Sequence, residues 1–517
     1  MTDERVVQFD GRTLSLQEVL MVSEQRAKVS VSDDAWPRID AARAVVERIV
    51  ATGETVYGIN TGFGALVAER ISQEDIEDLQ INLIRSHATA LGEPMSVRDV
   101  RAMMAVRLNS LCKGHSGIHQ DCIRQLVTYL NEGIHPVVPR IGSLGASGDL
   151  APLSHLALAL MGEGEVWVDG VVQPTRDVLF ERGLVPVKLT AKDGLSLING
   201  TSQMTAFALL AQQQLKSLLL LADVILGASM DARSCSLTPF NPQIHEARPH
   251  PGQRLVAERL RIVLSQSAIM EGHKDCDRVQ DPYSFRCAPQ VHGAVIESFH
   301  RLTEMLDIEL NSATDNPLIF PEPDNPGPHE VMSQGNFHGE IVATVCDAMS
   351  LALFELGSIS ERRMDQILDP AKSGLPAFLA KDSGLESGLM IVQYVAGSSL
   401  AELHGQTMPR SAFSTSTSAG QEDHVSMGAT AAWNLYQGVQ RLAEVLACEA
   451  LIACEALEHA TLSSSDHVEA FRRMVRSISP PLAGDRTTST ELQRIARELL
   501  DGGWAARLQA ECGRLPQ

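Results

Sequence analysis

The stretch from Ile141 to Leu150, I-G-S-L-G-A-S-G-D-L, has the most unusual chemical potential in the chain. Its small residues allow the backbone to bend sharply, because glycine adopts conformations that other residues avoid. If the loop is held tightly, the amide nitrogen of Gly148 can attack the carbonyl carbon of Ala146. Loss of water from that ring and from the Ser147 side chain would leave an exocyclic methylene conjugated to an imidazolone. The protein would then carry an electrophile, which no ordinary side chain supplies.

Three other interpretations of this stretch are a plain turn, a phosphate-binding loop and a nucleophile elbow. Clusters of Gly, Ser and Asp usually mark turns, so the plain turn stays open. A phosphate-binding loop ends in Gly-Lys-Ser or Gly-Lys-Thr, which is missing here. The elbow G-x-S-x-G needs a residue between the serine and the second glycine, whereas Gly148 directly follows Ser147. Spacing therefore excludes the last two interpretations.

The composition indicates what kind of fold positions this loop. Of the 517 residues, 44% are hydrophobic but only 4% are aromatic, so the core must be built mainly from Ala, Leu, Val, Ile and Met. That composition is typical of helix bundles. The net charge of -21 would repel a phosphate backbone, which argues against a nucleic-acid partner.

Cysteine usage and apolar runs bear on the cellular compartment. Nine cysteines are scattered without any C-x-x-C spacing, so we expect neither disulfides nor a zinc site, and we expect no metal in the site. The N-terminus lacks the apolar segment of a signal peptide, and no apolar run approaches the length of a membrane span. These features predict a cytoplasmic protein without a membrane partner.

Apolar residues recur at helical spacing over much of the chain. The expected helices cover roughly 38–52, 80–91, 197–225, 292–314, 338–368, 388–406 and 425–459. A β-hairpin is expected at 165–174, with its turn at Asp169-Gly170.

We therefore predict a mostly α-helical fold, a large bundle of long helices with a smaller, loop-rich N-terminal region. The loop-bearing region would cover residues 1–200, the long-helix bundle 201–460 and a C-terminal helical segment 461–517. A coiled-coil domain is the structural alternative, but sustained heptads with charged flanks are missing from the sequence.

Two candidate functional side chains lie in the N-terminal region. Tyr57 stands in V-Y-G-I-N-T-G-F-G, residues 56–64, a bent or mobile loop. A phenol on a lid can act as a general base, and surface packing is the alternative. His87 lies near the end of the helix expected at 80–91, where a histidine commonly interacts with the helix dipole.

Further candidates follow the loop. Asn199 sits at a helix entry, where an N-cap role is the alternative. Gln280, Tyr283, Arg286 and Gln290 recur at three- and four-residue spacing, which on a helix would align them along one face. The guanidinium fork of Arg286 suits a substrate carboxylate, and an interhelical polar seam is the alternative.

Two more motifs are hard to explain by packing. Phe337 lies in S-Q-G-N-F-H-G-E, and Gln421 and Glu422 lie in S-A-G-Q-E-D-H-V-S-M, before the longest expected helix. A carboxylate in the first turn of that helix, complementing its dipole, is the alternative for Glu422.

Together these motifs resemble those of the aromatic amino acid ammonia-lyases that use a methylidene-imidazolone (MIO) group. The resemblance runs in order from about residue 55 to 460. It rests on Y-G-x-N-T-G-F-G, G-S-x-G-A-S-G-D-L-x-P-L-x-H, N-G-T, V-Q-D-x-Y-S-x-R-C-x-P-Q, G-N-F-H-G-E and Q-E-D-H-V-S-M. It implies a mostly helical fold and a homotetramer with active sites built from three subunits.

The resemblance also implies a role for each candidate. Ala146, Ser147 and Gly148 match the residues that cyclise to MIO, and Tyr57 matches the lid tyrosine that removes the β-proton. Arg286 matches the anchor of the substrate carboxylate. Residues around the MIO group and the substrate are matched by Asn199, Gln280, Tyr283 and Phe337.

The substrate ring is the harder question. His87 and Glu422 match the pair that faces the substrate imidazole in histidine ammonia-lyases, and Gln421 precedes Glu422 in the same motif. Because a carboxylate accepts a hydrogen bond from an imidazole N–H, we expect L-histidine to be converted to urocanate. However, M-P-R-S-A-F-S-T-S-T-S-A-G departs from the usual H-P-A-S-V-D-S-x-P-T-S-A-N. A lyase for L-tyrosine, DOPA or phenylalanine, giving a coumarate-type acid, is the alternative.

Two further classes of function stay open. A 2,3-aminomutase would use the same MIO group but return ammonia to the β-carbon. A catalytically silent helical scaffold would keep Ala146-Ser147-Gly148 as a plain turn.

Overall fold

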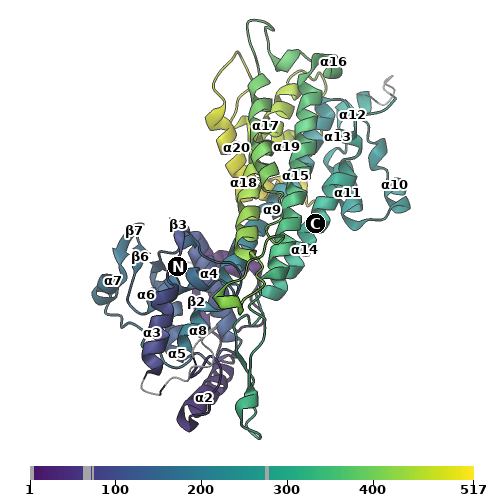
Figure 1. The fold of residues 1–517 in the computed structure, drawn as a ribbon. Helices are drawn as coiled ribbons and strands as arrows, with labels where there is room; N and C mark the ends of the chain where they lie inside the picture. The colour runs from purple at the N-terminus through teal and green to yellow at the C-terminus, as the bar shows by residue number, and fades with distance from the viewer. Residues whose placement is uncertain (1–4, 62–71, 73–74, 274–278) are drawn as a thin grey trace. The chain divides into compact units, whose positions relative to one another are not determined.

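The computed structural model describes residues 5–61, 72, 75–273 and 279–517. Most of these residues lie in helices (Figure 1), which confirms the expected mostly α-helical fold. The chain forms two compact units, each assembled from three stretches of sequence. The first comprises Met1–Leu210, Thr303–Cys346 and Pro409–Trp433, and the second Ala211–Leu302, Asp347–Met408 and Asn434–Gln517. The division expected at residues 200 and 460 stays a prediction.

The first unit combines helices with short strands. Its helices are α1 (Leu16–Ser23), α2 (Trp36–Thr52), α3 (Ile76–His87), α4 (Val97–Cys112), α5 (Gln120–Glu132), α6 (Leu150–Leu160), α7 (Thr175–Glu181), α8 (Asp193–Ile198) and the 3-10 turns η3 (Pro328–Glu330) and η5 (Ser418–Gly420). Its strands are β1 (Val6–Phe9), β2 (Lys28–Val31), β3 (Leu91–Pro94), β4 (His135–Pro136), β5 (Pro139–Ile141), β6 (Glu165–Val168), β7 (Val171–Pro174), β8 (Leu318–Ile319) and β9 (Val331–Met332).

The strands form four small sheets. β1 pairs with β2 in parallel, and the antiparallel sheets are β3-β5, β4-β6-β7 and β8-β9. The predicted hairpin is confirmed as β6 and β7, and Asp169 (φ +50°) and Gly170 (φ +79°) make its turn. Both residues have the left-handed backbone that a two-residue hairpin turn requires.

Local signals set several helix ends in the first unit. Ser96 begins α4 with a capping box, in which its hydroxyl accepts from the Asp99 amide while the Asp99 carboxylate accepts from the Ser96 amide. α2 ends at Gly53, whose φ of +71° would strain a side-chain-bearing residue. One face of α2, with Ala42, Val46 and Ile49, is buried in the core of this unit.

The helix expected at 80–91 ends earlier, at His87. Leu91 pairs with Ile141 and Pro94 with Pro139, so β3 binds the strand that leads into the 141–150 loop. Long-range pairing therefore takes residues that helical periodicity had assigned to α3. The correction places His87 at the last position of its helix.

Among the described residues, four helices have parts in both units: α9 (Ser202–Ala232), α14 (Ala288–Glu309), α15 (Glu340–Leu368) and α18 (Gly428–Leu457). The second unit also contains η2 (Thr238–Phe240), α10 (Pro242–Ala247), α11 (Pro251–Val263), α12 (Ala268–Gly272), α13 (Tyr283–Arg286), α16 (Pro370–Ser373), η4 (Ala377–Leu379), α17 (Met390–Gly405), α19 (Asp466–Arg476), α20 (Ser489–Asp501) and α21 (Gly503–Cys512). The long helices expected from periodicity are thus present. α9 begins after Asn199, and α18 has 30 residues instead of the expected 35 or so.

The core of the second unit lies between α15, α17 and α18 (Figure 1). α15 contributes Met364 and Ile367, α17 contributes Val392, and α18 contributes Val445 and Ile452. Aliphatic residues therefore fill this core, as the low aromatic content predicts.

α15 has the length and apolar composition that would allow it to cross a membrane, so the expectation that no apolar run reaches that length is wrong. However, 61% of its most apolar window is buried inside the protein. Burial on that scale is ordinary for a core helix, because core helices are apolar on most of their surface.

A fully buried ion pair links α15 to α18 in the second unit. The Arg363 guanidinium binds Glu449 through two contacts, Nε to Oε1 at 2.5 Å and Nη2 to Oε2 at 2.8 Å. Both side chains have no solvent exposure. The hydroxyls of Ser229 and Ser360 donate to the same carboxylate, at 2.7 and 2.5 Å. This carboxylate is therefore satisfied on both oxygens.

Replacing Arg363 by alanine should lower the free energy of unfolding by about 3–5 kcal/mol, because Glu449 would stay buried without its cation. Arg441→Ala is the matched control, since it removes partly exposed ion pairs with Glu402 and Glu444 and should cost less than ~1 kcal/mol. Urea unfolding followed by circular dichroism measures both losses. Equal losses would contradict a special contribution from burial.

Candidate active site

The 141–150 loop connects strand β5 to helix α6 in the first unit. Two residues at the centre of the loop are enclosed by the protein. Ala146 is only 8% exposed, and Gly148 is buried. Val425 and Met427 pack with Ala146 in a small apolar cluster, and Leu144 packs against it. The central part of the loop is therefore packed into the protein and is not a loose surface turn.

Glycine is required at two positions of the loop for steric reasons. Gly145 and Gly148 have φ values of +66° and +77°, a backbone that side-chain-bearing residues rarely adopt. A Cβ on Gly148 would lie 2.2 Å from the carbonyl oxygen of Gly200, and a Cβ on Gly145 would lie 2.2 Å from the Ser426 hydroxyl. The backbone at Gly148 can thus approach Gly200 only because it has no side chain.

Asp149 anchors the loop to the start of α9. Its carboxylate accepts hydrogen bonds from the Ser143 hydroxyl at 2.7 Å and from the backbone amides of Gln203 and Met204 at 2.7 and 3.1 Å. Burial raises the pKa of Asp149 to about 6, although these hydrogen bonds act to lower it. The Asp149 amide also donates to the Gly200 carbonyl at 2.7 Å, which completes the attachment.

A third segment, residues 417–428, holds the loop from another direction. The Met427 amide donates to the Leu144 carbonyl at 2.8 Å, and the Ser426 hydroxyl donates to the Gly145 carbonyl at 3.2 Å. Backbone contacts on both sides of Ala146-Ser147-Gly148 therefore restrict the loop.

Asn199 contacts the central residue of the loop directly. Its side-chain amide donates to the Ser147 carbonyl oxygen at 2.9 Å. Asn199 follows the last residue of α8 with an extended backbone, so the alternative of an N-cap is wrong. The buried Arg107 fixes this position, because its Nη1 donates to the Asn199 carbonyl at 2.7 Å and its Nη2 to that of Ser196.

Glu422 also contacts Ser147, but through the serine hydroxyl and not through the backbone carbonyl. Its Oε1 accepts from the Ser147 hydroxyl at 3.1 Å, and its Oε2 accepts from the Thr417 hydroxyl at 2.9 Å. Backbone hydrogen bonds between Thr417 and Glu422 close the turn that presents the carboxylate. Because α18 begins only at Gly428, the first-turn alternative for Glu422 is also wrong.

His87 lies within the electrostatic reach of Glu422. Burial lowers the pKa of His87, while its hydrogen bond with the Leu83 backbone and the charge of Glu422 act in the opposite direction. The His87 Nδ1 lies 3.0 Å from the Ser86 hydroxyl. The structure thus places Glu422 in contact with Ser147, although the two residues lie far apart in the sequence, and the charge of Glu422 acts on His87.

Three other predicted residues lie in the same unit. Tyr57 is half-buried at a bent turn, and the adjacent Gly58 is packed so closely that a Cβ would lie 2.7 Å from Pro317 Cδ. Phe337 is half-buried and Gln421 is exposed beside Glu422. The glycine-rich end of the predicted 56–64 loop lies outside the described residues.

Gln280, Tyr283 and Arg286 belong to the second unit and do not share one helix face, contrary to the prediction. Gln280 precedes α13, which is only four residues long, and Cys287 separates it from α14. The break has a local cause, since Pro289 lacks the amide hydrogen that a continuous helix would need. The Arg286 guanidinium stacks on the Tyr283 ring at 4.3 Å, and Tyr283 is 70% exposed.

A cavity of about 1370 Å³ lies beside these residues, and its lining includes Gln280, Arg286 and Gln290. Within the described part of the chain, neither Arg286 Nε nor Gln290 Oε1 has a hydrogen-bond partner. Unsatisfied donors and acceptors at a cavity wall are available to a polar ligand.

The residues that hold the loop were less accessible to sequence reasoning than the loop itself. The sequence patterns predict no role for four of these residues: Asp149, Arg107, Thr417 and Ser426. Two of them, Asp149 and Ser426, nevertheless lie inside the motifs quoted above. An acidic residue directly before the apolar helix 150–160 was the one local signal for Asp149. Arg107 gave none, because its contacts join residues 89 and 92 positions apart.

These features fit an MIO group at Ala146-Ser147-Gly148. Gly148 has the side-chain-free, tightly packed backbone that ring closure onto Ala146 needs, and Asn199 already donates to the carbonyl that would become part of the ring. The Ser147 hydroxyl, which would leave as water, is held by Glu422. The chain's own residues therefore suit formation of the group.

Comparison with known proteins agrees with this geometry. The family model for aromatic amino acid lyases matches residues 14–477. A histidine ammonia-lyase from Myxococcus xanthus is 44% identical over 96% of both chains, and one from Geobacillus thermodenitrificans is 44% identical over 95% of this chain and 96% of the relative.

Solved structures show the same relationship. The histidine ammonia-lyase of Trypanosoma cruzi has a TM-score of 0.90 and 39% identity, covering 99% of this chain and 96% of the other. A tyrosine aminomutase from Streptomyces globisporus has a TM-score of 0.92 and 35% identity, covering 99% and 100%. The match spans most of the chain in sequence and in structure, so this protein belongs to the aromatic amino acid lyase family.

Proposed function

We propose that this protein is an ammonia-lyase that eliminates ammonia from L-histidine and releases urocanate. The observation that carries this proposal is the Glu422 carboxylate, which contacts Ser147 of the clamped loop and acts electrostatically on His87. The Glu422 carboxylate can accept a hydrogen bond from an imidazole N–H, and its contact with Ser147 places that acceptor at the loop. The histidine ammonia-lyases among the relatives support the same substrate.

We further propose that Ala146, Ser147 and Gly148 mature into an MIO group. When present, such a group supplies an electrophile that makes the substrate amine a better leaving group. Asn199 would stabilise negative charge on the Ser147 carbonyl oxygen through its 2.9 Å hydrogen bond, as preorganised donors do at oxyanions. Asp149, Ser426 and Gly200 would hold the backbone in the bent form that cyclisation needs.

The other predicted residues would remove the β-proton and anchor the substrate. Tyr57 would take the β-proton as a general base. Arg286 would bind the substrate carboxylate, for which its unsatisfied Nε is suited. Gln280 and Tyr283 would contact the substrate or the MIO group, and Phe337 and Gln421 would border the substrate.

We propose that the active enzyme is a cytoplasmic homotetramer whose active sites combine residues of three subunits. Tyr283 is 70% exposed in the single chain, as expected for a site residue that another subunit covers. The buried cysteines Cys112, Cys122, Cys448 and Cys454 carry free thiols, which are usual in a reducing compartment.

A 2,3-aminomutase is the second candidate, because a tyrosine aminomutase is structurally as similar to this chain as a histidine ammonia-lyase is. The two activities differ in the fate of ammonia, which an aminomutase returns to the β-carbon. A β-amino acid among the products would identify the mutase, whereas a lyase releases only the unsaturated acid and ammonia. A lyase for tyrosine, DOPA or phenylalanine is the remaining alternative for the substrate.

The intact mass of the chain tests the proposed maturation. Wild-type protein should be lighter than its sequence mass by two water molecules, and Ser147→Ala should lack the loss of the hydroxyl and should not turn over histidine. Mass spectrometry and urocanate absorbance measure the two effects. An unmodified wild-type mass, or near-normal turnover by Ser147→Ala, would refute the MIO mechanism.

Gly148→Ala should block maturation, because the new Cβ would meet the Gly200 carbonyl at 2.2 Å. Gly170→Ala is a matched control, since Gly170 has almost the same φ (+79° against +77°) but no atom within 4 Å of the added carbon. The control should keep the mass loss and cost only about 1–2 kcal/mol of backbone strain. Normal maturation of Gly148→Ala would contradict the importance of this close approach.

Glu422→Gln should reduce turnover of histidine far more than any turnover of tyrosine, because an amide is a weaker acceptor for the imidazole N–H than a carboxylate. Asp423→Asn removes the same charge from the neighbouring exposed residue and should leave the ratio of the two substrates unchanged. Steady-state kinetics with each amino acid gives that ratio. Equal losses on both substrates would argue against a role of Glu422 in reading the imidazole.

A further inference from the structure

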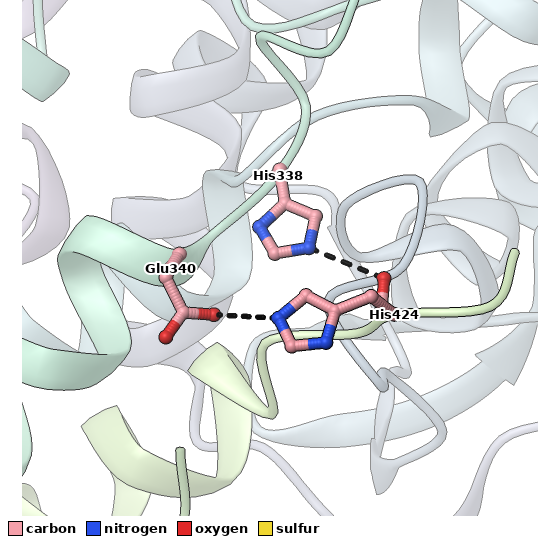
Figure 2. A group of neighbouring side chains, drawn as sticks. All are labelled: His338, Glu340 and His424. Atoms are coloured by element: carbon pink, nitrogen blue, oxygen red, sulfur yellow. Dashed lines mark hydrogen bonds and ion pairs between the residues drawn. The ribbon is translucent and has the colours of Figure 1, made fainter. Parts of the chain in front are cut away.

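Among the described residues, one group of three metal-ligating side chains lies close enough to share an ion. It consists of His338, Glu340 and His424, whose ligand atoms all lie within 4.8 Å of one another (Figure 2). Glu340 is the first residue of α15, His338 lies two residues before it, and His424 lies in the 417–428 segment. All three belong to the first unit. None of them was assigned a role in the proposed elimination of ammonia.

The two imidazoles lie close together and nearly parallel. Figure 2 shows the two imidazoles next to each other beside the Glu340 carboxylate. Their ring centroids are 5.6 Å apart and their planes differ by 4°. His338 Nε2 lies 3.3 Å from the His424 carbonyl oxygen, and His424 Nε2 lies 3.9 Å from Glu340 Oε2. Because a carbonyl oxygen can only accept, His338 Nε2 donates the hydrogen bond to the His424 carbonyl and carries the ring proton, which leaves His338 Nδ1 as the nitrogen with a lone pair for a ligand.

Glu340 has unsatisfied bonding capacity at this place. Its Oε2 is buried, and within the described part of the chain no residue donates a hydrogen bond to it. The 3.9 Å separation from His424 is too long for a hydrogen bond, so the contact is at most a weak ion pair. A buried acceptor without a donor is uncommon in proteins, and a bound cation would satisfy it.

The backbones that carry these ligands are held in place, while the side chains can adjust. Gly339 packs so closely against Met204 that an added Cβ would lie 2.3 Å from its sulfur. The Val425 amide, next to His424, donates to the Ser414 hydroxyl at 2.9 Å. The side chains of His424 and Glu340 are 66% and 42% exposed. Small rotations would therefore bring the ligand atoms to the separation of about 3.3 Å found around a tetrahedral ion.

We propose that His338, Glu340 and His424 bind one divalent transition-metal ion of the Zn²⁺ or Co²⁺ class. Two imidazoles and one carboxylate form a donor set suited to such ions, and three protein ligands leave a position for water. The ion would join the start of α15 to the 417–428 segment, which carries Glu422 and contacts the 141–150 loop. Its role would be to position that segment.

The test is a titration of full-length, chelator-treated protein with Co²⁺, followed by visible absorption, and with Zn²⁺, followed by calorimetry. Wild-type protein should bind one ion per chain at this site. His424→Asn and Glu340→Gln should each weaken that binding by at least about ten-fold. His459→Asn removes an exposed histidine elsewhere and should leave the affinity unchanged.

A second measurement guards against variants that fold poorly. Zn²⁺ should raise the unfolding temperature of wild-type protein and of His459→Asn, because a ligand that binds the folded state stabilises it. It should fail to do so for His338→Asn. Absence of saturable binding by wild-type protein, or equal affinity in wild type and His424→Asn, would overturn the proposal and leave a histidine–glutamate ion pair.

Discussion

The close approach of two backbones, at Gly148 and Gly200, is the constraint on which the rest of the site depends. A Cβ at Gly148 would overlap the Gly200 carbonyl, so the contact exists only because Gly148 lacks a side chain. The hydrogen bond from the Asp149 amide to Gly200 and the contacts of the Asp149 carboxylate with the start of α9 maintain it. Helix α9 begins immediately after this contact, so the loop is fixed to a rigid element of the fold.

Burial of Asp149 is unfavourable by itself and raises the pKa of its carboxyl group. Two backbone amides at a helix start and one hydroxyl offset much of that cost, because helix N-termini favour negative charge. Burial of this carboxyl group therefore costs free energy, but its hydrogen bonds prevent the loop from relaxing into an ordinary turn. Restriction of this kind is what an intramolecular attack of one backbone amide on a nearby carbonyl requires.

The 417–428 segment connects the loop to the recognition side of the site. Ser426 and Met427 bind the loop backbone, and Glu422, only a few residues earlier, contacts the Ser147 hydroxyl. His424 lies between these contacts and belongs to the proposed metal cluster. A shift of this short segment would therefore alter loop support together with the proposed substrate recognition and metal binding.

Local chemistry in the sequence was enough to identify the long helices, the Asp169-Gly170 hairpin, and the Ala146-Ser147-Gly148 loop with its small residues. These features depend on periodicity, turn preference and motif spacing, which neighbouring residues encode. The end of α3 at His87, the extended backbone of Asn199 and the contact of Glu422 with Ser147 were decided by tertiary structure. Each depends on partners tens to hundreds of residues away, as in the 275-residue separation of Ser147 and Glu422. The local conformational preferences of residues contain no information about such distant partners. Only the folded chain therefore shows which side chains surround the loop.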